Sequence, residues 1–268
     1  MIIGNRTFDT EHEVYIMGIL NVTPDSFSDG GKYNQMDQAL FHGEALVQAG
    51  ADILDIGGES TRPNHHRIAD EEEMERVCPI IEALRSRFDI PISLDTYKTP
   101  VARAGIQAGA DMINDIWGLK WDGTMAKTIA ETGVAVCIMH NRREAEYKNY
   151  MEEVVEDLKE SLYLAKEAGI DGNKICIDPG IGFAKNLEQN LQIMKHLDRL
   201  QELKVPILLG ASRKSMIGLT LDLPVDQREE GTIATTVFGI MKGCSIIRVH
   251  DVTRNLRAAK MTLAMLRA

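Results

Sequence analysis

The sequence predicts one α/β domain over residues 1–268, a (β/α)8 TIM barrel with an N-terminal β-hairpin. Short apolar segments alternate with amphipathic helical patterns from Tyr15 onward, in eight units of about 33 residues, the spacing of such a barrel. The short segments carry apolar residues on both faces, as parallel strands covered by helices do. Nearly every one is followed at once by polar residues, the position at which barrel enzymes carry their chemistry.

The hairpin is expected at the start of the chain. Residues Met1 to Val14 alternate weakly in polarity around Gly4-Asn5, a pair suited to a tight turn. We expect this hairpin to plug one end of the barrel.

The eight strands are expected where β-branched and other apolar residues run together between turn residues. They are Tyr15–Leu20, Ile53–Ile56, Ile92–Leu94, Met112–Asn114, Ala135–Met139, Lys174–Ile177, Pro206–Leu209 and Ser245–Val249. The expected helices are Met36–Ala49, Asp70–Phe88, Thr99–Ala108, Gly123–Thr132, Met151–Ala168, Leu187–Gln201, Arg228–Met241 and Val252–Leu266. Four helices are followed by Gly50, Gly109, Gly133 or Gly169, and glycine favours the left-handed conformation that ends a helix.

An internal repeat supports one barrel rather than two unrelated domains. The chain reads A-G-A-D-I-L-D-I from Ala49 and A-G-A-D-M-I-N-D-I from Ala108, so one helix-end-to-strand unit occurs twice. The main alternative is a doubly wound open sheet. It is disfavoured because no G-x-G-x-x-G follows the first strand.

The composition bounds the class of protein. Apolar residues make up 44% of the chain, enough for a large core, yet no apolar run is long enough to predict a transmembrane helix. No secretory signal is visible, and the four cysteines lie outside C-x-x-C pairs, which indicates buried free thiols in the cytoplasm. The net charge of −10 argues against a nucleic-acid partner, and we expect small-molecule substrates instead.

The carboxyl ends of the expected strands should meet on one face of the barrel. The polar residues at those ends are Asn21, Glu59 to Pro63, Asp95, Asn114, Asp115, His140, Asp178, Ser212 to Lys214, Arg248, His250 and Asp251. Roles in turns and helix caps would explain one or two such residues, but they explain less easily a polar residue at the end of nearly every strand. We therefore expect a single polar mouth.

Two carboxylates of this set suggest recognition of a flat heterocycle. Asp95 and Asp178 each end an apolar strand, where a carboxylate must be paired or hydrogen-bonded. A carboxylate can accept two parallel N–H bonds from a guanidine-like edge, and Asn114 could add a donor and an acceptor to the same ring. The alternative for both carboxylates is a capping role.

The cationic residues suggest a site for an anionic group. Arg248 and His250 are two residues apart on one strand and should face the same way, with Lys214 on the preceding unit. Together with the amide of Asn21 they would form an oxyanion pocket, and Mg²⁺ could bind Asn21 and a diphosphate. The alternative for Arg248 and His250 is a salt bridge with Asp251 or Glu229. Arg213 is expected to point away from the site.

Two long loops complete the expected mouth. Residues Thr23 to Gly31 and Gly57 to Arg67 are rich in Gly, Pro, Ser and Thr, and such loops can close over a site and exclude water. Their informative side chains are Phe27, Asp29, Thr61 and Arg62.

Seven segments, taken together, resemble the dihydropteroate synthase family of bacterial folate synthesis. They are Met17–Gly31 (M-G-I-L-N-V-T-P-D-S-F-S-D-G-G), Asp55–Pro63 (D-I-G-G-E-S-T-R-P), Ser93–Thr96 (S-L-D-T), Ile113–Ile116 (I-N-D-I), Asp178–Phe183 (D-P-G-I-G-F), Ser212–Lys214 (S-R-K) and Arg248–Val252 (R-V-H-D-V). They extend from the first barrel strand to the last helix. The chain departs from the family pattern after the fifth strand, from Met139 to Tyr147, and we assign His140 no catalytic role.

The resemblance implies a reaction and a cofactor. The family condenses (7,8-dihydropterin-6-yl)methyl diphosphate with 4-aminobenzoate and releases diphosphate. An SN1-like path fits, because the substrate amine is the nucleophile and the pterin can stabilise a cation at its methylene carbon. The resemblance also implies Mg²⁺ and a homodimer. The alternatives are a corrinoid-linked pterin methyltransferase domain and a non-catalytic pterin-binding paralogue, neither of which needs all of Lys214, Arg248, His250 and Asp178.

The resemblance assigns residues to four roles. The pterin ring would contact Asp95, Asn114, Asp178, Lys214 and Arg248. The diphosphate would contact Asn21, Arg248 and His250, with Asn21 as the metal ligand and Asp29 as a second candidate. The aminobenzoate pocket, where sulfonamides compete in this family, would comprise Phe27, Thr61, Arg62, Pro63, Phe183, Lys214 and Ser215. The catalytic candidates are Asp95, Lys214 and Asp29.

Overall fold

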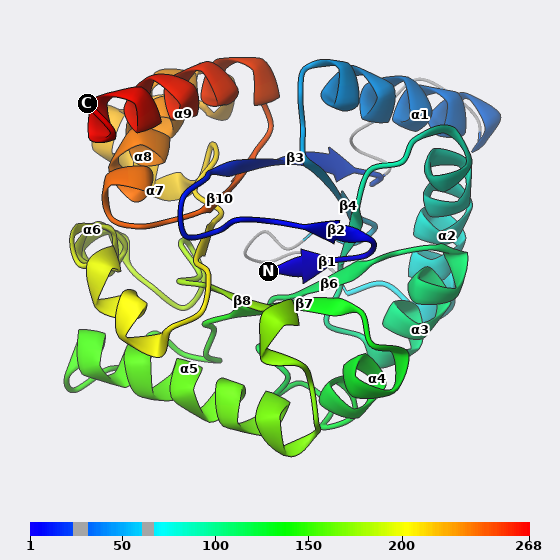
Figure 1. Cartoon of the computed structure of the whole chain (residues 1–268), viewed down its shortest axis with the longest axis horizontal. Coiled ribbons are helices and arrows are strands. Elements are labelled where there is room, and N and C mark those ends of the chain that lie inside the picture. The colour runs from blue at the N-terminus through cyan, green and yellow to red at the C-terminus, as the bar shows by residue number, and fades with distance from the viewer. Residues whose placement is uncertain (24–31, 61–66) are drawn as a thin grey trace.

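The computed structural model describes residues 1–23, 32–60 and 67–268 (Figure 1). Its eight-stranded parallel sheet has the order β8-β7-β6-β5-β4-β3-β10-β9. An isolated parallel bridge between Ile177 and Ile207 joins β8 to the chain entering β9 and closes the sheet. Helices surround it on the outside (Figure 1), so the predicted (β/α)8 barrel is confirmed.

The bounds of the elements are as follows. The barrel strands are β3 (Tyr15–Asn21), β4 (Ile53–Gly57), β5 (Ile92–Asp95), β6 (Met112–Asp115), β7 (Ala135–Met139), β8 (Ile175–Asp178), β9 (Leu208–Leu209) and β10 (Ile246–Val249). The α-helices are α1 (Lys32–Gln48), α2 (Asp70–Arg87), α3 (Thr99–Ala108), α4 (Met125–Thr132), α5 (Tyr150–Glu167), α6 (Leu187–Lys195), α7 (Ser215–Leu221), α8 (Glu229–Met241) and α9 (Val252–Leu266). The 3-10 helices are η2 (Gly172–Lys174), η3 (Leu197–Leu203) and η4 (Val225–Gln227).

Three features of the elements differ from what the sequence predicts. The segment expected as one helix, Leu187–Gln201, is divided into α6 and η3 at His196, whose φ of −112° is not helical. The helix α7 was not expected, since its seven residues are too few to show a clear helical period. Strand β9 is shorter than expected because Pro206 has no N–H to donate to a ladder.

The hairpin closes the end of the barrel opposite the strand carboxyl ends. Strands β1 (Ile2–Ile3) and β2 (Arg6–Thr7) pair antiparallel and cross the barrel opening in Figure 1. Ile3 and Phe8 are buried beneath them against Met17 and other residues at the start of the barrel strands. Burial of two such side chains contributes roughly 3–6 kcal/mol, which is enough to hold a two-strand hairpin in place.

The glycines expected to end four helices do so. Gly50, Gly109, Gly133 and Gly169 have φ values of 95°, 114°, 68° and 86°, in the left-handed region that only glycine adopts without strain. Each ends a helix just before the next strand begins, which fixes where that strand enters the barrel.

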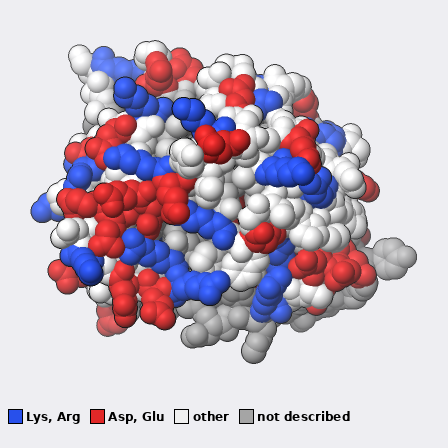
Figure 2. Space-filling view, turned by 90° about the horizontal axis from the view of Figure 1, so that it is seen from below, with Lys and Arg blue, Asp and Glu red and all other residues white. Residues whose placement is uncertain are grey.

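The cysteines, the helices and the surface charges can be compared with what the composition predicts. All four cysteines are free, with Cys137, Cys176 and Cys244 buried and Cys78 half-buried. Among the described residues, none of the helices combines the length and the apolar character needed to cross a membrane. Figure 2 shows Lys and Arg side chains interspersed with Asp and Glu on one face of the molecule.

Candidate active site

The carboxyl ends of the barrel strands surround a small cavity. Its lining residues are Asp95, Asn114, Ile116, Met139, Asp178, Phe183, Gly210, Lys214 and Arg248. Six predicted site residues from five different strand–loop units therefore lie together. The parallel sheet brings them together because the strands all end on one face.

Arg248 lies between two carboxylates at the base of this cavity. Its Nε donates to Asp55 Oδ2 at 2.6 Å, and its NH2 group donates to Asp95 Oδ2 at 2.7 Å. Burial opposes the charged guanidinium, but the two carboxylates raise the pKa of Arg248, so it stays charged. The salt bridge considered with Asp251 or Glu229 is not the one that forms. Asp251 instead caps α9 by accepting from the Arg254 N–H at 3.0 Å.

Each of these carboxylates has one oxygen without a hydrogen-bond partner. Asp55 Oδ1 and Asp95 Oδ1 are buried and lack a hydrogen-bond partner among the described residues. A buried acceptor left without a partner costs free energy, so such an atom marks a place where a ligand donor belongs. Burial raises the pKa of Asp95 to about 7; Arg248 opposes the shift and Asp55 adds to it.

Asp178 and Lys214 form another part of the cavity wall. Asp178 Oδ1 accepts from the Gly180 N–H at 2.6 Å, and burial raises the pKa of this carboxyl although Lys214 opposes the shift. Burial lowers the pKa of Lys214 to about 8, against the pull of Asp178 and Asp95. Lys214 donates from Nζ to the Ile181 carbonyl, and that ammonium lies 4.6 Å from the centroid of the Phe183 ring. The cavity thus combines acceptors, a cation and an aromatic face.

Asn114 and Asn21 supply amides on either side of Asp95. Asn114 Nδ2 lies 3.4 Å from Asp55 Oδ2. Asn21 ends β3 and pairs with Gly57, which in turn pairs with Asp95 in the sheet. A Cβ at Gly57 would lie 3.6 Å from Asn21 Oδ1 and 3.7 Å from Asp95 Cβ, so only a glycine separates these two side chains.

His250 is held by Ser212 at the rim. Its Nδ1 lies 2.8 Å from Ser212 Oγ, and that oxygen also accepts from the His250 backbone N–H at 3.3 Å. The serine hydroxyl can donate to Nδ1 or accept from it, depending on the tautomer of the ring, and either arrangement fixes the position of the imidazole. Arg213 turns toward α8, as expected, and its Nε lies 3.6 Å from Glu229 Oε2.

The remaining predicted residues are placed differently. Ser215 begins α7 and is exposed beside Lys214. Asp115 does not line the cavity; it accepts from the Trp117 and Leu119 N–H groups at 2.8 and 2.7 Å, so its role is the capping alternative. Five candidates lie outside the described residues: Phe27, Asp29, Thr61, Arg62 and Pro63.

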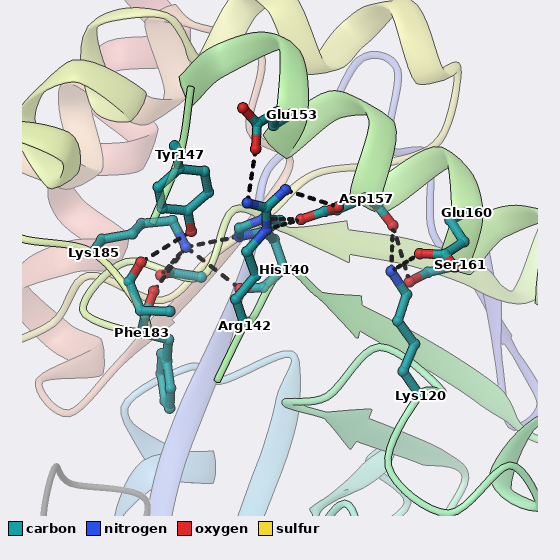
Figure 3. A network of polar contacts seen from close by, with 12 residues as sticks. Lys120, His140, Arg142, Tyr147, Glu153, Asp157, Glu160, Ser161, Phe183 and Lys185 are labelled. Carbon is teal, nitrogen blue, oxygen red and sulfur yellow. Dashed lines mark hydrogen bonds and ion pairs between the residues drawn. The ribbon is translucent and has the colours of Figure 1, made fainter. Parts of the chain in front are cut away.

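The sequence analysis missed Asp55 as a site residue. It lies inside β4 rather than at its end, and a charged residue in an otherwise apolar strand was the available signal. His140, which received no catalytic role, does not line the cavity. It is buried under the loop that follows β8, where its Nδ1 lies 2.8 Å from Lys185 Nζ (Figure 3).

The donor set fits one hard cation bound with a phosphate ligand. Among the described residues, no three His, Cys, Asp or Glu side chains gather into a metal cluster. The amide oxygen of Asn21 lies at the mouth, and Mg²⁺ commonly takes one or two protein oxygens with the rest from phosphate and water.

This arrangement can bind a flat, hydrogen-bonding ring and stabilise negative charge beside it. Buried carboxylates and Asn114 offer acceptors and a donor in a small cavity, and Lys214 and Arg248 supply positive charge. A serine, cysteine or threonine nucleophile does not line the cavity among the described residues.

Comparisons with known proteins agree with this geometry. Residues 17–250 match the model of the family described as pterin binding enzyme. The chain is 58% identical to the dihydropteroate synthase of Clostridium beijerinckii over 98% of both chains. It is 51% identical to that of Bacillus subtilis, over 96% of this chain and 90% of the relative.

Solved structures give the same result. The Clostridium difficile dihydropteroate synthase, crystallised with pteroic acid, is 50% identical with a TM-score of 0.95, over 98% of this chain and 100% of that one. The Xanthomonas albilineans enzyme with 4-aminobenzoic acid is 43% identical with a TM-score of 0.92, over 96% of this chain and 94% of that one. The chain belongs to the pterin-binding enzyme family and, within it, to the dihydropteroate synthases.

Proposed function

We propose that the protein condenses (7,8-dihydropterin-6-yl)methyl diphosphate with 4-aminobenzoate to give 7,8-dihydropteroate and diphosphate. The observation that carries the proposal is the pair of buried, unpartnered oxygens on Asp55 and Asp95 beside Arg248 and Lys214. The N–H edge of a pterin supplies the donors that these acceptors lack. The transferase activity follows from membership of the dihydropteroate synthases.

The lining residues divide into two roles in this proposal. Asp95, Asn114 and Asp178 hold the edge of the pterin ring, with Lys214 beside it and Arg248 against its face. Lys214, Phe183 and Ser215 form the described part of the aminobenzoate pocket. Phe27, Thr61, Arg62 and Pro63 complete that pocket in the proposal, and sulfonamides would compete there.

The diphosphate binds at Asn21, Arg248 and His250 in this proposal. The guanidinium of Arg248 is a suitable donor to an anion, and so is the His250 imidazole in the tautomer that carries its proton on Nε2. Mg²⁺ would be held by the Asn21 amide oxygen, with Asp29 as a second ligand, and supplies charge that favours departure of diphosphate. The protein residues bind and orient the anion so that its negative charge is stabilised as it leaves.

The chemical step is proposed to be SN1-like. The bond from the methylene carbon to the diphosphate oxygen breaks first, and the electron pair leaves with the diphosphate. The amine of 4-aminobenzoate then attacks the cation and loses a proton. Asp95, close to the ring, stabilises the cation in its ionised form.

One experiment tests the reaction and its path. We expect diphosphate release only when both substrates and Mg²⁺ are present, in equal amount with 7,8-dihydropteroate. Deuteration of the methylene carbon should slow the step by a secondary isotope effect clearly above unity. Methyl transfer without diphosphate release would overturn the proposed function. An isotope effect near unity in an active enzyme would overturn only the SN1-like path.

We also propose that the protein is a homodimer. Several large apolar side chains are exposed on α7, α8 and α9, which pack against one another on one flank of the barrel (Figure 1). They are Leu219, Leu221, Phe238, Met241, Met261, Met265 and Leu266. Exposed large apolar side chains gathered on neighbouring helices are typical of a face covered by another chain.

The three buried, unpaired cysteines suit a reducing cytoplasm, which is the proposed location.

A further inference from the structure

A buried amine lies behind the loop that follows β8. Lys185 Nζ lies 2.8 Å from His140 Nδ1, 3.0 Å from the Gly180 carbonyl oxygen and 2.9 Å from the Phe183 carbonyl oxygen. Nζ also lies 3.5 Å from the His140 carbonyl oxygen, so four acceptors surround an amine that has three hydrogens when protonated. Burial lowers the pKa of Lys185 to about 7, while Asp178 opposes the shift. Figure 3 shows the amine between the His140 ring and the backbone of Phe183.

His140 connects Lys185 to Asp157 on α5. Burial lowers the pKa of His140 to about 4, so the ring is neutral. Its Nδ1 accepts from Lys185, and its Nε2–H donates to Asp157 Oδ2 at 3.0 Å, which assigns the tautomer. Arg142 Nε donates to the same Asp157 oxygen at 2.6 Å. Burial opposes ionisation of Asp157, but the His140 and Arg142 hydrogen bonds lower its pKa.

The loop between β8 and α6 needs such support because of its backbone. Gly180, Gly182 and Ala184 have φ values of 71°, 82° and 43°, and for alanine this conformation is strained. A Cβ at Gly180 would lie 2.0 Å from the His140 carbonyl oxygen, so the two loops are in direct backbone contact. Tyr147 OH donates to the Ala184 carbonyl at 2.9 Å. The segment that departs from the family pattern thus supports this loop.

The other side of the same loop forms two parts of the cavity. Phe183, whose carbonyl accepts from Lys185, directs its ring away from the network in Figure 3 and lines the cavity. Gly180, whose carbonyl also accepts from Lys185, donates its N–H to Asp178 Oδ1. Displacing the Lys185 amine would therefore release the backbone on both sides of Ile181.

We propose that Lys185 and His140 are positioning residues that set the Phe183 ring for the aromatic amine substrate. They do not line the cavity and act through the backbone of the β8–α6 loop. The identity of that substrate as 4-aminobenzoate rests on the proposed function. Phe183 receives the direct support, whereas Asp178 is also held by β8, so the two substrates should respond differently.

The test compares Lys185→Met with Lys195→Met, a matched change at an exposed position in the last turn of α6. We expect Lys185→Met to raise KM for 4-aminobenzoate about tenfold or more, the scale of a lost charge-assisted hydrogen bond, with a smaller change in kcat and in KM for the pterin diphosphate. Equal changes in both KM values, or none, would overturn the proposal. His140→Asn keeps an acceptor near the Nδ1 position and should be milder than His140→Leu.

A second readout needs no activity. Hydrogen exchange followed by mass spectrometry should show faster exchange over residues 179–186 in Lys185→Met than in wild type or Lys195→Met. Unchanged exchange there would overturn the positioning role. The two proposals can fail separately. If Lys185→Met exchanges faster but the wild-type protein releases no diphosphate, the support of the loop by Lys185 stands and the proposed function is overturned.

Discussion

Arg248 explains much of the site at the scale of single residues. One guanidinium engages an oxygen on Asp55 and another on Asp95, and the second oxygen of each carboxylate is buried without a hydrogen-bond partner among the described residues. Leaving a buried acceptor without a partner is unfavourable, so a ligand with N–H groups that reaches these oxygens would be favoured. The contacts with Arg248 therefore position the two carboxylates without any help from a substrate.

Some residues of the site could be predicted from the sequence and others could not. Asp95, Asn114, Asp178 and Lys214 were predictable because each follows an apolar strand and the barrel collects strand ends. Asp55 was missed because it lies within a strand, where only its inward direction reveals a role. The contact between Lys185 and His140 joins residues 45 positions apart, and no local pattern encodes such a pairing.

The raised pKa of Asp95 leads to a prediction about pH. Oδ2 faces Arg248, so a proton taken up below about pH 7 would go to Oδ1 and remove the acceptor that the ligand needs. Affinity for a pterin analogue should then fall as pH drops from 7 to 5, by up to about tenfold per pH unit. Isothermal titration calorimetry across this range would measure it.

The control for that prediction uses two variants. Asp95→Asn should reduce the pH dependence of binding by about one proton, whereas Asp226→Asn, at an exposed position, should leave it unchanged. The stability of the fold has the opposite pH dependence. Because the folded-state pKa is raised, wild-type stability should fall from pH 4 to 7 relative to Asp95→Asn. Affinity that stays constant between pH 5 and 7 would contradict the assignment.

At the scale of elements, local signals predicted most of the barrel. Helices α3 and α9 and strand β7 have the predicted bounds because glycines, prolines and apolar runs mark their ends. Strands β5, β6 and β8 extend one residue further than expected, since each C-terminal aspartate remains in the strand. The short helix α7 depends on packing against α6 and α8, which a single sequence does not display.

The approach of β9 to the cavity gives a second prediction. A Cβ at Gly210 would lie 3.2 Å from Asp178 Oδ2, so Gly210→Ala should push that carboxylate by a few tenths of an ångström. We expect KM for the pterin diphosphate to rise about tenfold, because small misplacements at a binding edge are costly. The melting temperature should change by less than about 5 °C.

Gly172→Ala is the matched control for this change. Its Cβ would meet nothing within 4 Å, so both KM and melting temperature should match wild type. The role given to the Asp178 wall would be wrong if Gly210→Ala bound the pterin as tightly as Gly172→Ala.

At the scale of the whole molecule, the apolar flank of α7, α8 and α9 lies apart from the residues that line the cavity. If a second copy covers this flank, Met241→Lys should weaken the dimer, because a charge would have to be buried in an apolar interface. Sedimentation velocity should show a shift toward monomer. Phe41→Lys, at an exposed apolar residue on α1, should remain dimeric. A wild-type monomer at micromolar concentration would contradict the proposal.

The isolated bridge between Ile177 and Ile207 has a consequence for how the barrel moves. The other neighbouring barrel strands among the described residues share ladders of two or more residue pairs, whereas β8 meets the chain before β9 through this bridge. We expect thermal motion to part the barrel wall first at this junction. Asp178 ends the strand on one side and Lys214 follows the strand on the other, so a brief parting would move these two cavity-lining side chains away from each other while the longer ladders stay intact.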